Sequence, residues 1–241
     1  MEWFQEGHVA IVTGGSRGLG KALARELLDK GLHVIIDARD AAELERARLE
    51  LAAVSRGELR AIAGDVSDVE HAHALVAAAQ GMGRLDLLVN NASTLGRVPL
   101  PRIAQLDRTT FDALFDVNVF APIHLIQHAL PLLAQSETAT IVNVTSDAGV
   151  EGYPTWGGYG ATKAALEHVS RVLATELEGG TTRVLVFDPG DMNTQMHRDA
   201  LPGADPSQLC DPADSAGALM AAIAAMQGGF EHMRAADVVP A

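Results

Sequence analysis

Cysteine is nearly absent from the sequence, and long hydrophobic runs are missing. A single cysteine, Cys210, excludes an internal disulfide framework and a metal site built from several thiolates. No apolar stretch reaches the length of a membrane-spanning helix. Residues 1–15 also lack the basic segment and the apolar run of a signal peptide. We therefore expect a protein of the cytoplasm that does not enter a membrane.

Positive charge is scarce as well. The 18 lysines and arginines face 31 acidic residues, which gives a formal net charge of −13. Such a chain repels phosphate backbones and anionic membranes, so we expect a small-molecule partner. Of the nine histidines, only His124 and His128 share a helical face. No third ligand stands at a matching spacing, which favours a helix surface or a subunit interface over a metal site.

Short runs rich in valine and isoleucine alternate with longer segments of helical periodicity, which is typical of a parallel sheet with crossover helices. Strands are predicted at residues 8–13, 33–38, 59–64, 85–90, 139–144 and 183–188, and helices at about 17–31, 109–133 and 159–177. No repeat or linker divides the chain. We expect one α/β domain over residues 1–241, with a doubly wound parallel sheet, helices on both faces, and a mobile lid at residues 193–210.

The first predicted strand runs directly into TGGSRGLG at residues 13–20 and then into a helix. Glycines let the backbone approach a pyrophosphate, and the helix N-terminus offers free N–H groups and a positive dipole end. The same residues fit G-x-S-x-G, the nucleophile elbow of hydrolases, with Ser16 as nucleophile and Asp188 with His197 or His232 as partners. An elbow after the first strand would leave no earlier strand for an oxyanion-hole loop, so the dinucleotide site is favoured.

The second strand ends in Asp37-Ala38-Arg39, where a dinucleotide fold meets the adenosine ribose. An acid at this place hydrogen-bonds the ribose hydroxyls of NAD, whereas an arginine accepts the additional phosphate of NADP. These residues alone leave both cofactors possible.

Proton chemistry is indicated by Tyr159 and Lys163, which stand four residues apart at the start of a predicted helix and therefore share one face. A phenol with a pKa near 10 is a poor base at neutral pH, but a neighbouring ammonium favours the phenolate. Tyr159 can then exchange a proton with a substrate oxygen. Ser146 follows the fifth strand, where open α/β sheets bind ligands, and is placed to hold that oxygen.

Pro122 stands four residues after Asn118 within a predicted helix. Because proline has no N–H, the carbonyl of Asn118 loses its helical partner and needs a water or a side chain instead. That carbonyl would suit a water relay to a buried lysine. A kinked packing helix without a catalytic part is the alternative.

Together these residues resemble the short-chain dehydrogenase/reductase family in its compact branch. The resemblance covers about residues 8–196. It rests on TGxxxGxG at 13–20, Asp65 before Val66, NNA at 90–92, Asn118, Ser146, YxxxK at 159–163 and PGxMxT at 189–194. It implies a Rossmann-type fold and hydride transfer between a nicotinamide and a carbonyl or secondary alcohol. A protein that only senses cofactor is disfavoured, because binding alone does not require the Tyr–Lys pair.

The resemblance also implies roles for individual residues. Asn118, Ser146, Tyr159 and Lys163 would form the catalytic set, with Ser146 and Tyr159 on the substrate oxygen. Residues that would bind the cofactor are Gly14, Ser16, Arg17, Gly18, Leu19, Gly20, Arg39, Asp65, Val66, Asn91, Ala92, Tyr159, Lys163, Pro189, Gly190, Met192 and Thr194. The helices of Asn118 and Tyr159 would pair across a two-fold axis in a homodimer or homotetramer.

Cofactor choice follows from the same resemblance. The NAD-selecting acid of the family occupies the last strand position, which is Ala38 here, and Arg39 falls where the family places its phosphate-binding base. Arg17 adds a second positive charge. We therefore expect NADP(H) to be preferred over NAD(H), with Asp37 turned away as a buried, hydrogen-bonded acid. NAD is the alternative cofactor.

Two departures from the family pattern stand out. Ser93 follows NNA where the family usually has glycine, and the C-terminal segment lacks a recognisable last strand before a Gly-Gly tail. Residues 230–239 are expected to form at most a short edge strand. Residues expected to contact the substrate are Val150, Glu151, Tyr153, Trp156, Asp191, Met192 and Met196.

Overall fold

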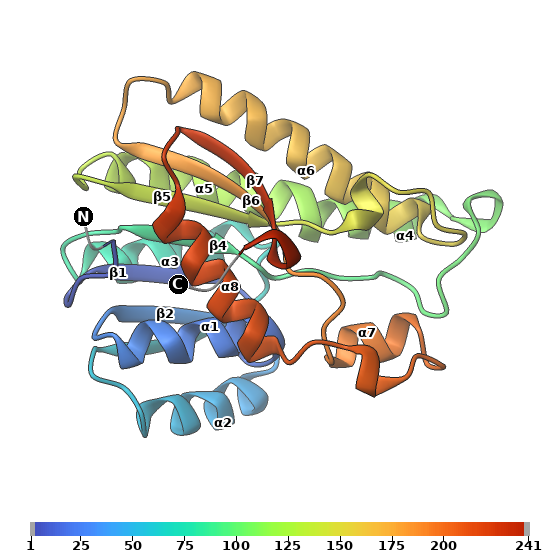
Figure 1. The fold of residues 1–241 in the computed structure, drawn as a ribbon, viewed down its shortest axis with the longest axis horizontal. Coiled ribbons are helices and arrows are strands. Elements are labelled where there is room, and N and C mark those ends of the chain that lie inside the picture. Colours follow the sequence, from blue (N-terminus) through green and yellow to red (C-terminus); the bar gives the residue numbers. More distant parts are fainter. Residues whose placement is uncertain (1–2, 239–241) are drawn as a thin grey trace.

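A computed structural model describes residues 3–238 and shows a parallel sheet of seven strands in the order β3-β2-β1-β4-β5-β6-β7 (Figure 1). The strands are β1 (Val9–Val12), β2 (His33–Ala38), β3 (Leu59–Ala63), β4 (Leu87–Asn90), β5 (Ala139–Val144), β6 (Thr182–Asp188) and β7 (Phe230–Arg234). The six strands predicted from the sequence are confirmed, each with ends within two residues of the prediction. Asp65 lies in the loop that follows β3.

Helices cover both faces of the sheet (Figure 1). They are α1 (Gly18–Asp29), α2 (Ala41–Ala52), α3 (Val69–Gln80), α4 (Arg108–Phe115), α5 (Ala121–Leu133), α6 (Gly157–Glu176), α7 (Gln195–Ala200) and α8 (Pro212–Ala225). Ala10 and Val12 of β1 pack with α1 and α8, while Val9 and Ile11 pack with α3 and α5. Burial on both faces explains why the strands read as continuous apolar runs.

The strand order reverses direction between β1 and β4. The chain first builds outward from β1 to β3, then returns to β4 and continues to β7 on the other side. The loops that follow β1 and β4 therefore run to opposite sides at the carboxyl edge of the sheet. Doubly wound folds bind their ligands in the crevice between such loops. The predicted doubly wound α/β fold is confirmed.

The C-terminal segment does form a strand. β7 lies parallel to β6 at the sheet edge, and its register places Arg234 opposite Asp188. The expected strand over residues 230–239 is thus shorter than predicted, because the chain turns into a 3₁₀ helix at Ala235–Asp237. Val239 lies outside the described residues.

The helix predicted over residues 109–133 is interrupted by a π-helical segment, Asp116–Phe120, between α4 and α5. The Ala121 N–H bonds to the carbonyl of Asp116, five residues earlier. Pro122 follows in the first turn of α5, and the helical backbone runs through Phe120 and Ala121 without a break. The widened turn contains Asn118, and such π segments are frequent at functional sites.

The predicted lid, residues 193–210, contains α7 and a 3₁₀ turn at Pro206–Gln208. An isolated β-bridge joins Met192 to Cys210, with the Asn193 N–H donating to the Cys210 carbonyl at 2.9 Å. The segment is therefore a loop whose two ends are tied together. Within residues 3–238, no helix combines the length and apolar character needed to cross a bilayer.

Asp86 fastens the opposite, amino-terminal edge of the sheet. Its buried carboxylate accepts hydrogen bonds from the Val9 N–H at 2.9 Å, the Ser136 hydroxyl at 2.6 Å and two Arg84 guanidinium nitrogens at 2.8 Å. Burial alone would raise the pKa of Asp86, but the bonds from Arg84, Ser136 and Val9 outweigh it and lower the pKa below its ordinary value. This carboxylate therefore stabilises the fold in its charged form.

Replacing Asp86 by asparagine should lower the free energy of unfolding at pH 7 by about 2–3 kcal/mol, because a buried acceptor of several charge-assisted bonds is lost. Since the folded-state pKa lies below the unfolded value of about 3.9, this contribution is present above that pH and is lost as the pH falls further. Urea unfolding at pH 7 and pH 3 measures it. The difference between variant and wild type should shrink at pH 3, whereas Asp29→Asn, at an exposed position, should show little effect at either pH. An equal loss at both pH values would contradict this account.

Candidate active site

The carboxyl ends of the strands open into one cavity of about 1090 Å³. A pocket for a single drug-sized molecule measures about 300–1,000 Å³, so this space is large enough for a dinucleotide with a substrate. Predicted site residues that line it are Gly14, Ser16, Arg17, Gly18, Leu19, Arg39, Asp65, Val66, Asn91, Ala92, Ser146, Tyr159, Lys163, Pro189, Gly190, Met192 and Thr194. The structure thus brings together residues from both halves of the sheet. Gly20 and Asn118 are not part of the cavity wall.

The glycine turn after β1 approaches the end of β4 closely. Gly14 has φ of +67°, and a Cβ there would lie 3.0 Å from both the Ala92 Cα and the Asn91 Nδ2. The Asn91 side chain donates to the Thr13 carbonyl at 2.8 Å and so holds the turn in place. A side chain at position 14 would press against Asn91 and Ala92. Because Gly14 has none, backbone atoms line the floor of the cavity here.

Gly20 also has a packing role, which the sequence analysis did not predict. A Cβ at Gly20 would lie 2.5 Å from the Gly14 carbonyl oxygen and from the Asn91 side-chain nitrogen. Gly20 therefore lets α1 pack against the glycine turn, while its expected contact with the cofactor stays a prediction. The motif alone does not separate glycines that face a ligand from glycines that face the helix.

The N-terminus of α1 offers unpaired N–H groups to the cavity. Aspartates cap four other helices, with Asp40, Asp68, Asp107 and Asp211 at the starts of α2, α3, α4 and α8. Arg17 precedes α1 without a side-chain cap, and the first turn holds no acid. Since Arg17, Gly18 and Leu19 line the cavity, this end of α1 fits the pyrophosphate of a dinucleotide.

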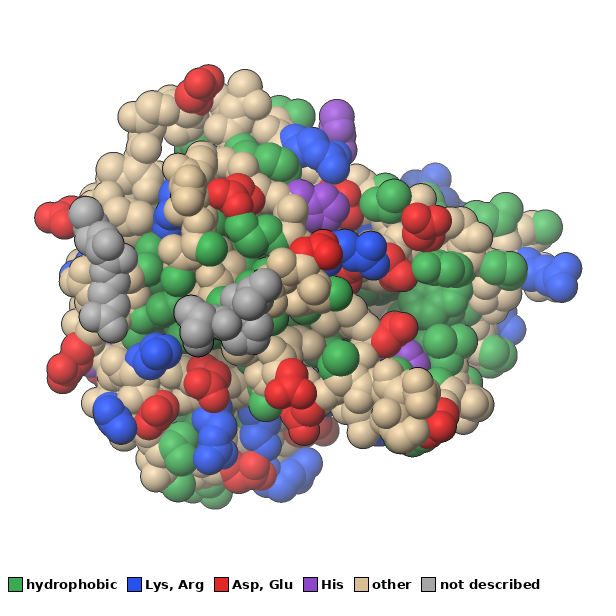
Figure 2. Space-filling model, viewed as in Figure 1, with side chains coloured by type: hydrophobic (Ala, Val, Ile, Leu, Met, Phe, Trp, Pro, Cys, Tyr) green, Lys and Arg blue, Asp and Glu red, His purple; other side chains and the backbone are tan. Residues whose placement is uncertain are grey.

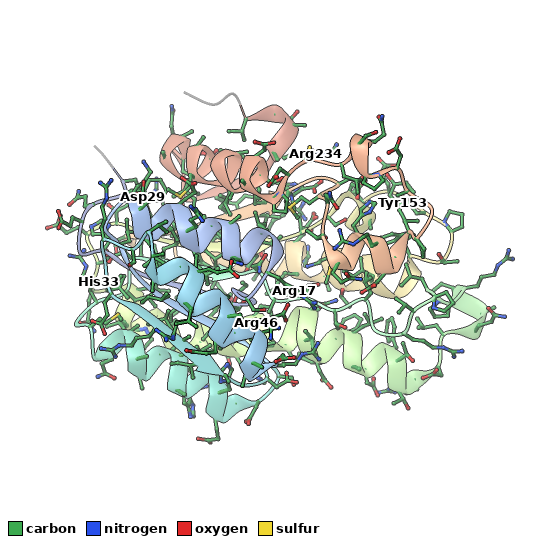
Figure 3. All side chains as sticks on the ribbon, turned by 90° about the horizontal axis from the view of Figure 1, so that it is seen from below. Arg17, Asp29, His33, Arg46, Tyr153 and Arg234 are labelled. Carbon is green, nitrogen blue, oxygen red and sulfur yellow. The ribbon has the colours of Figure 1, made fainter. Side chains whose placement is uncertain are left out.

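Arginines gather at the adenosine end of the cavity. Arg39 is exposed at its wall, and the Arg17 guanidinium lies 4.0 Å from Glu43 in the first turn of α2. Arg46 of α2 is a third arginine near this turn, which the sequence analysis missed because no motif marks it (Figure 3). The Glu43 N–H, which bonds to Asp40, and the charges of Arg46 and Arg17 lower the pKa of the Asp40 carboxyl.

Asp37 is buried, with 1% of its surface exposed, and accepts the Gly14 N–H at 2.7 Å. Its second carboxylate oxygen lies 2.9 Å from the Nε2 of His71 on α3. The acid is therefore held on the glycine turn, as a buried hydrogen-bonded group, and Arg39 is left as the charged side chain at the mouth.

Tyr159 and Lys163 lie in the first turns of α6 and are both buried. The Lys163 ammonium donates to the Val144 carbonyl at 2.9 Å and lies 5.4 Å from the centre of the Tyr159 ring. Burial lowers the pKa of Lys163 to about 8, against the opposing charges of Glu167 and Asp188. Lys163 therefore keeps most of its positive charge at neutral pH, beside the phenol.

Burial also raises the pKa of the Tyr159 phenol, and the hydrogen bond between its hydroxyl and Ser93 acts in the opposite direction. The Ser93 hydroxyl in turn donates to the Asn118 Oδ1 at 3.0 Å. Ser93, which stands where the family usually has glycine, thus links the phenol to Asn118. The sequence had marked this position only as a departure.

Asn118 is 1% exposed and acts through its neighbours rather than at the cavity wall. Its amide accepts the Thr94 N–H at 2.8 Å and donates to the Thr94 carbonyl at 2.9 Å and to the Thr162 hydroxyl at 3.0 Å. These bonds fasten the segment after β4 to the π-helical turn and to α6. The predicted catalytic residues Asn118 and Tyr159 are therefore brought together, with Ser93 between them.

Ser146 lies at the end of β5, where its hydroxyl donates to Asp147 at 3.0 Å and accepts the Ala148 N–H at 3.2 Å. Asp188, at the end of β6, lines the same cavity. Burial raises the pKa of Asp188, although the Gly190 N–H donates to it and Arg234 of β7 lies 3.4 Å away. The sequence analysis missed the Asp188–Arg234 pair because Arg234 lies in the segment that matched no motif.

Tyr159 forms an apolar cluster with Leu95 and Ala148, and four partly buried side chains pack against this cluster: Leu100, Trp156, Met196 and Ala200. Figure 2 shows hydrophobic side chains gathered at the end of the molecule that carries α7. Of the expected substrate contacts, Trp156, Asp191, Met192 and Met196 line the cavity. The structure places Val150, Glu151 and Tyr153 outside its lining, and Tyr153 is exposed and donates to Asp147 at 2.8 Å (Figure 3).

His128 faces α3 rather than pairing with His124. Its Nε2 lies 3.0 Å from the Nε2 of His73, and the two rings meet edge to face. Among residues 3–238, no cluster of three or more histidine, cysteine or acidic side chains is arranged to hold a metal ion.

Comparison with known proteins decides the family. The model of the family described as short chain dehydrogenase matches residues 8–204. The chain belongs to the short-chain dehydrogenase/reductase family. It is therefore an NAD(P)-dependent oxidoreductase, and the alternatives of a Ser16 hydrolase and a cofactor sensor are wrong. The Ser16 hydroxyl donates to Glu43 at 3.4 Å.

Several short-chain dehydrogenase/reductase proteins are similar over most of their length. A rhamnolipids biosynthesis 3-oxoacyl-[acyl-carrier-protein] reductase of Pseudomonas aeruginosa is 37% identical over 201 residues, which cover 80% of this chain and 75% of the relative. A short chain dehydrogenase structure from Pseudomonas syringae has a TM-score of 0.87 at 31% identity and covers 98% of this chain and 97% of its own. One from Shigella flexneri, solved with NADP, has a TM-score of 0.87 at 27% identity, with 98% and 100% coverage.

In a short-chain dehydrogenase/reductase with Tyr159 as proton acceptor, Ser93→Ala should impair alcohol oxidation at low pH. Once Tyr159 has lost its proton, the Ser93 hydroxyl can turn from Asn118 and donate to the phenolate, and a charge-assisted bond of about 1.5 kcal/mol corresponds to about one pKa unit. The pH at which the oxidation rate falls to half of its maximum should therefore rise by about one unit, and the KM for the cofactor should stay unchanged. Ser93→Thr retains a hydroxyl and serves as the control. The same pH profile in Ser93→Ala and wild type would show that this hydroxyl does not act on the phenol.

Proposed function

We propose that the protein catalyses NADP(H)-dependent hydride transfer between the nicotinamide and a carbonyl or secondary alcohol, with Tyr159 as general acid and base. The observation that carries this proposal is the buried Tyr159–Lys163 pair in a cavity that also contains the glycine turn. The pair supplies the proton chemistry, and the turn supplies a dinucleotide site. Reduction of a carbonyl needs both a hydride and a proton.

The residues at hand fit a nicotinamide dinucleotide. The N-terminus of α1 and the backbone of Gly14 and Gly18 would hold the pyrophosphate, because a glycine has no side chain of its own to keep a phosphate from its backbone. Asp65 would meet the adenine, and Thr194 would meet the carboxamide. When bound, the nicotinamide supplies the hydride in reduction or accepts it in oxidation.

Tyr159 would donate its hydroxyl proton to the substrate oxygen during reduction and recover it from the alcohol during oxidation. Ser146 would hold the same oxygen by a hydrogen bond. Lys163 stabilises the phenolate that remains, because its ammonium lies under the ring in a site shielded from water. The apolar side chains around Tyr159 exclude water from the transferred proton.

Tyr159→Phe should reduce turnover on a good ketone substrate by about 10²- to 10⁴-fold, because general acid catalysis is lost. Cofactor affinity should stay nearly the same, since only the ionisable hydroxyl is removed. Steady-state rates and a cofactor titration measure the two effects separately. Retention of more than about half of the activity would show that another group donates the proton.

We also propose that NADP(H) is preferred over NAD(H). Arg39 and Arg17 border the cavity at the adenosine end, and Asp37 is bonded to the glycine turn. A related short chain dehydrogenase from Shigella flexneri has been solved with NADP, which supports the same choice here. Guanidinium groups bind a phosphate by charge-assisted hydrogen bonds that a ribose hydroxyl cannot match.

Arg39→Ala should lower the ratio of kcat/KM for NADPH to that for NADH by about tenfold or more. One charge-assisted contact is worth about 1.5–3 kcal/mol, and about 1.4 kcal/mol corresponds to a factor of ten. Arg48→Ala is a matched control, because Arg48 lies on α2 shortly after Arg39 but pairs with Glu45 and does not line the cavity. Equal efficiencies of wild type with the two cofactors, or an NADH preference, would refute the assignment.

The remaining properties are proposals of the same kind. We propose a single domain over the whole chain, in which residues 193–210 move as a lid when ligands bind, and a homodimer or homotetramer that works in the cytoplasm. Phe120, next to the Asn118 turn, and Val172 on α6 are exposed, which supports an interface that involves these helices.

A further inference from the structure

His71 is a buried histidine beneath the adenosine end of the cavity. It lies on α3 with 7% of its surface exposed, and its Nε2 is 2.9 Å from the Asp37 Oδ2. A Cβ at Gly64 would lie 2.1 Å from the His71 ring, so the imidazole occupies space that only a glycine at position 64 leaves open. No motif of the sequence analysis includes His71.

Asp37 is bonded on both of its carboxylate oxygens. Oδ1 accepts the Gly14 N–H at 2.7 Å, and Oδ2 bonds to His71. The backbone of Asp37 adds a further link, because its carbonyl accepts the Gly15 N–H at 2.9 Å. The carboxylate is therefore clamped between the glycine turn on one side and α3 on the other.

Asp37 is one residue before the strand end and borders the cavity together with Ala38 and Arg39. A free carboxylate in this region would accept a hydrogen bond from the ribose 2′-hydroxyl of NAD, and its charge would oppose the 2′-phosphate of NADP. Both effects favour NAD. The bond to His71 removes the oxygen that would otherwise be available to a ribose.

We infer that His71 is a specificity-determining positioning residue, which keeps the Asp37 carboxylate on the glycine turn and away from the adenosine ribose. Selection at the 2′-position is then left to Arg39. This inference rests on the proposed use of NADP(H). To Arg17 and Arg39, the side chains proposed to bind the phosphate, it adds a residue that does not line the cavity. His71 acts through Asp37, without touching the cofactor.

A packing role for His71 would have a different signature from a positioning role. Loss of packing would loosen the glycine turn and weaken both cofactors to a similar degree, since both share the pyrophosphate. Loss of positioning leaves one oxygen of a buried carboxylate without a donor, and a buried unpaired acceptor takes a new donor where it can. The ribose hydroxyl of NAD is such a donor, so the two cofactors should respond in opposite directions.

The decisive variants are His71→Leu, which fills the space without a donor, and His71→Gln, whose amide nitrogen can replace the Nε2 as donor. In His71→Leu, the ratio of kcat/KM for NADPH to that for NADH should fall by about tenfold, through a higher KM for NADPH and a lower KM for NADH, with kcat unchanged. His71→Gln should keep the ratio within about threefold of wild type. His73→Leu, at an exposed position two residues further along α3, is the matched control.

A double-mutant cycle with Asp37→Asn tests the route of the effect. With the carboxylate removed, His71→Leu should no longer change the cofactor ratio. If His71→Leu does not fold, His71→Gln combined with Asp37→Asn and the two single variants still complete a cycle, and dissociation constants from cofactor-induced shifts in melting temperature replace kinetics. In that cycle, Asp37→Asn should erase whatever ratio change His71→Gln causes.

The outcomes separate this inference from the proposed function. A wild type without NADPH preference would overturn the proposed cofactor. A clear wild-type preference that His71→Leu leaves intact, or an equal loss with both cofactors, would overturn only the role of His71. Persistence of the His71→Leu effect in the Asp37→Asn background would do the same, because the effect would then bypass the carboxylate.

Discussion

The position of the glycine turn between β2 and β4 is the constraint on which the cavity depends. Gly14 is held from one side by the Asp37 carboxylate and from the other by the backbone of Ala92, with no room for a side chain. Because α1 begins four residues later, its N-terminus is aimed by the same contacts. The turn, the first helix and the ends of two strands are therefore linked by direct contacts, and such preorganisation lowers the entropy cost of binding a pyrophosphate.

The end of the cavity that contains Tyr159 depends on a second constraint, the burial of Lys163. An ammonium in an apolar environment loses hydration, which lowers the pKa of Lys163 to about 8. Glu167, one turn further along α6, and Asp188 at the end of β6 limit that loss by their negative charge. Glu167 is itself held by the Thr145 hydroxyl at 2.7 Å. The carboxylates behind Lys163 thus preserve the ammonium on which the proposed role of Tyr159 depends.

Local patterns predicted the strands and most of the cavity wall, because each depends on a few consecutive residues. The glycine turn and the Tyr159–Lys163 spacing are examples. Contacts between distant segments were not predictable in this way. Ser93 reaches Asn118 across 25 positions, and His71 reaches Asp37 across 34. The strand β7 was also obscure, since an edge strand that is only partly buried lacks the apolar run of a central strand. Gly20 shows a further limit, because the motif does not reveal that this glycine lets α1 pack against the turn.

The chain has a net charge of −13, although a nicotinamide dinucleotide is itself an anion. Binding therefore depends on the charges close to the site and not on the total charge. Charges more than about 10 Å apart are largely screened at physiological salt, so the distant acids contribute little at the adenosine end. What remains there is the group of Arg17, Arg39 and Arg46, set against Asp40 and Glu43 of α2. Asp40 is occupied as the cap of α2, and Glu43 lies within reach of both Ser16 and Arg17. Each acid near the proposed phosphate site thus has a partner, as Asp37 has in His71. These acids therefore only partly offset the charge of the arginines that NADP(H) would meet. An acidic chain can in this way present a locally positive site to a dinucleotide phosphate.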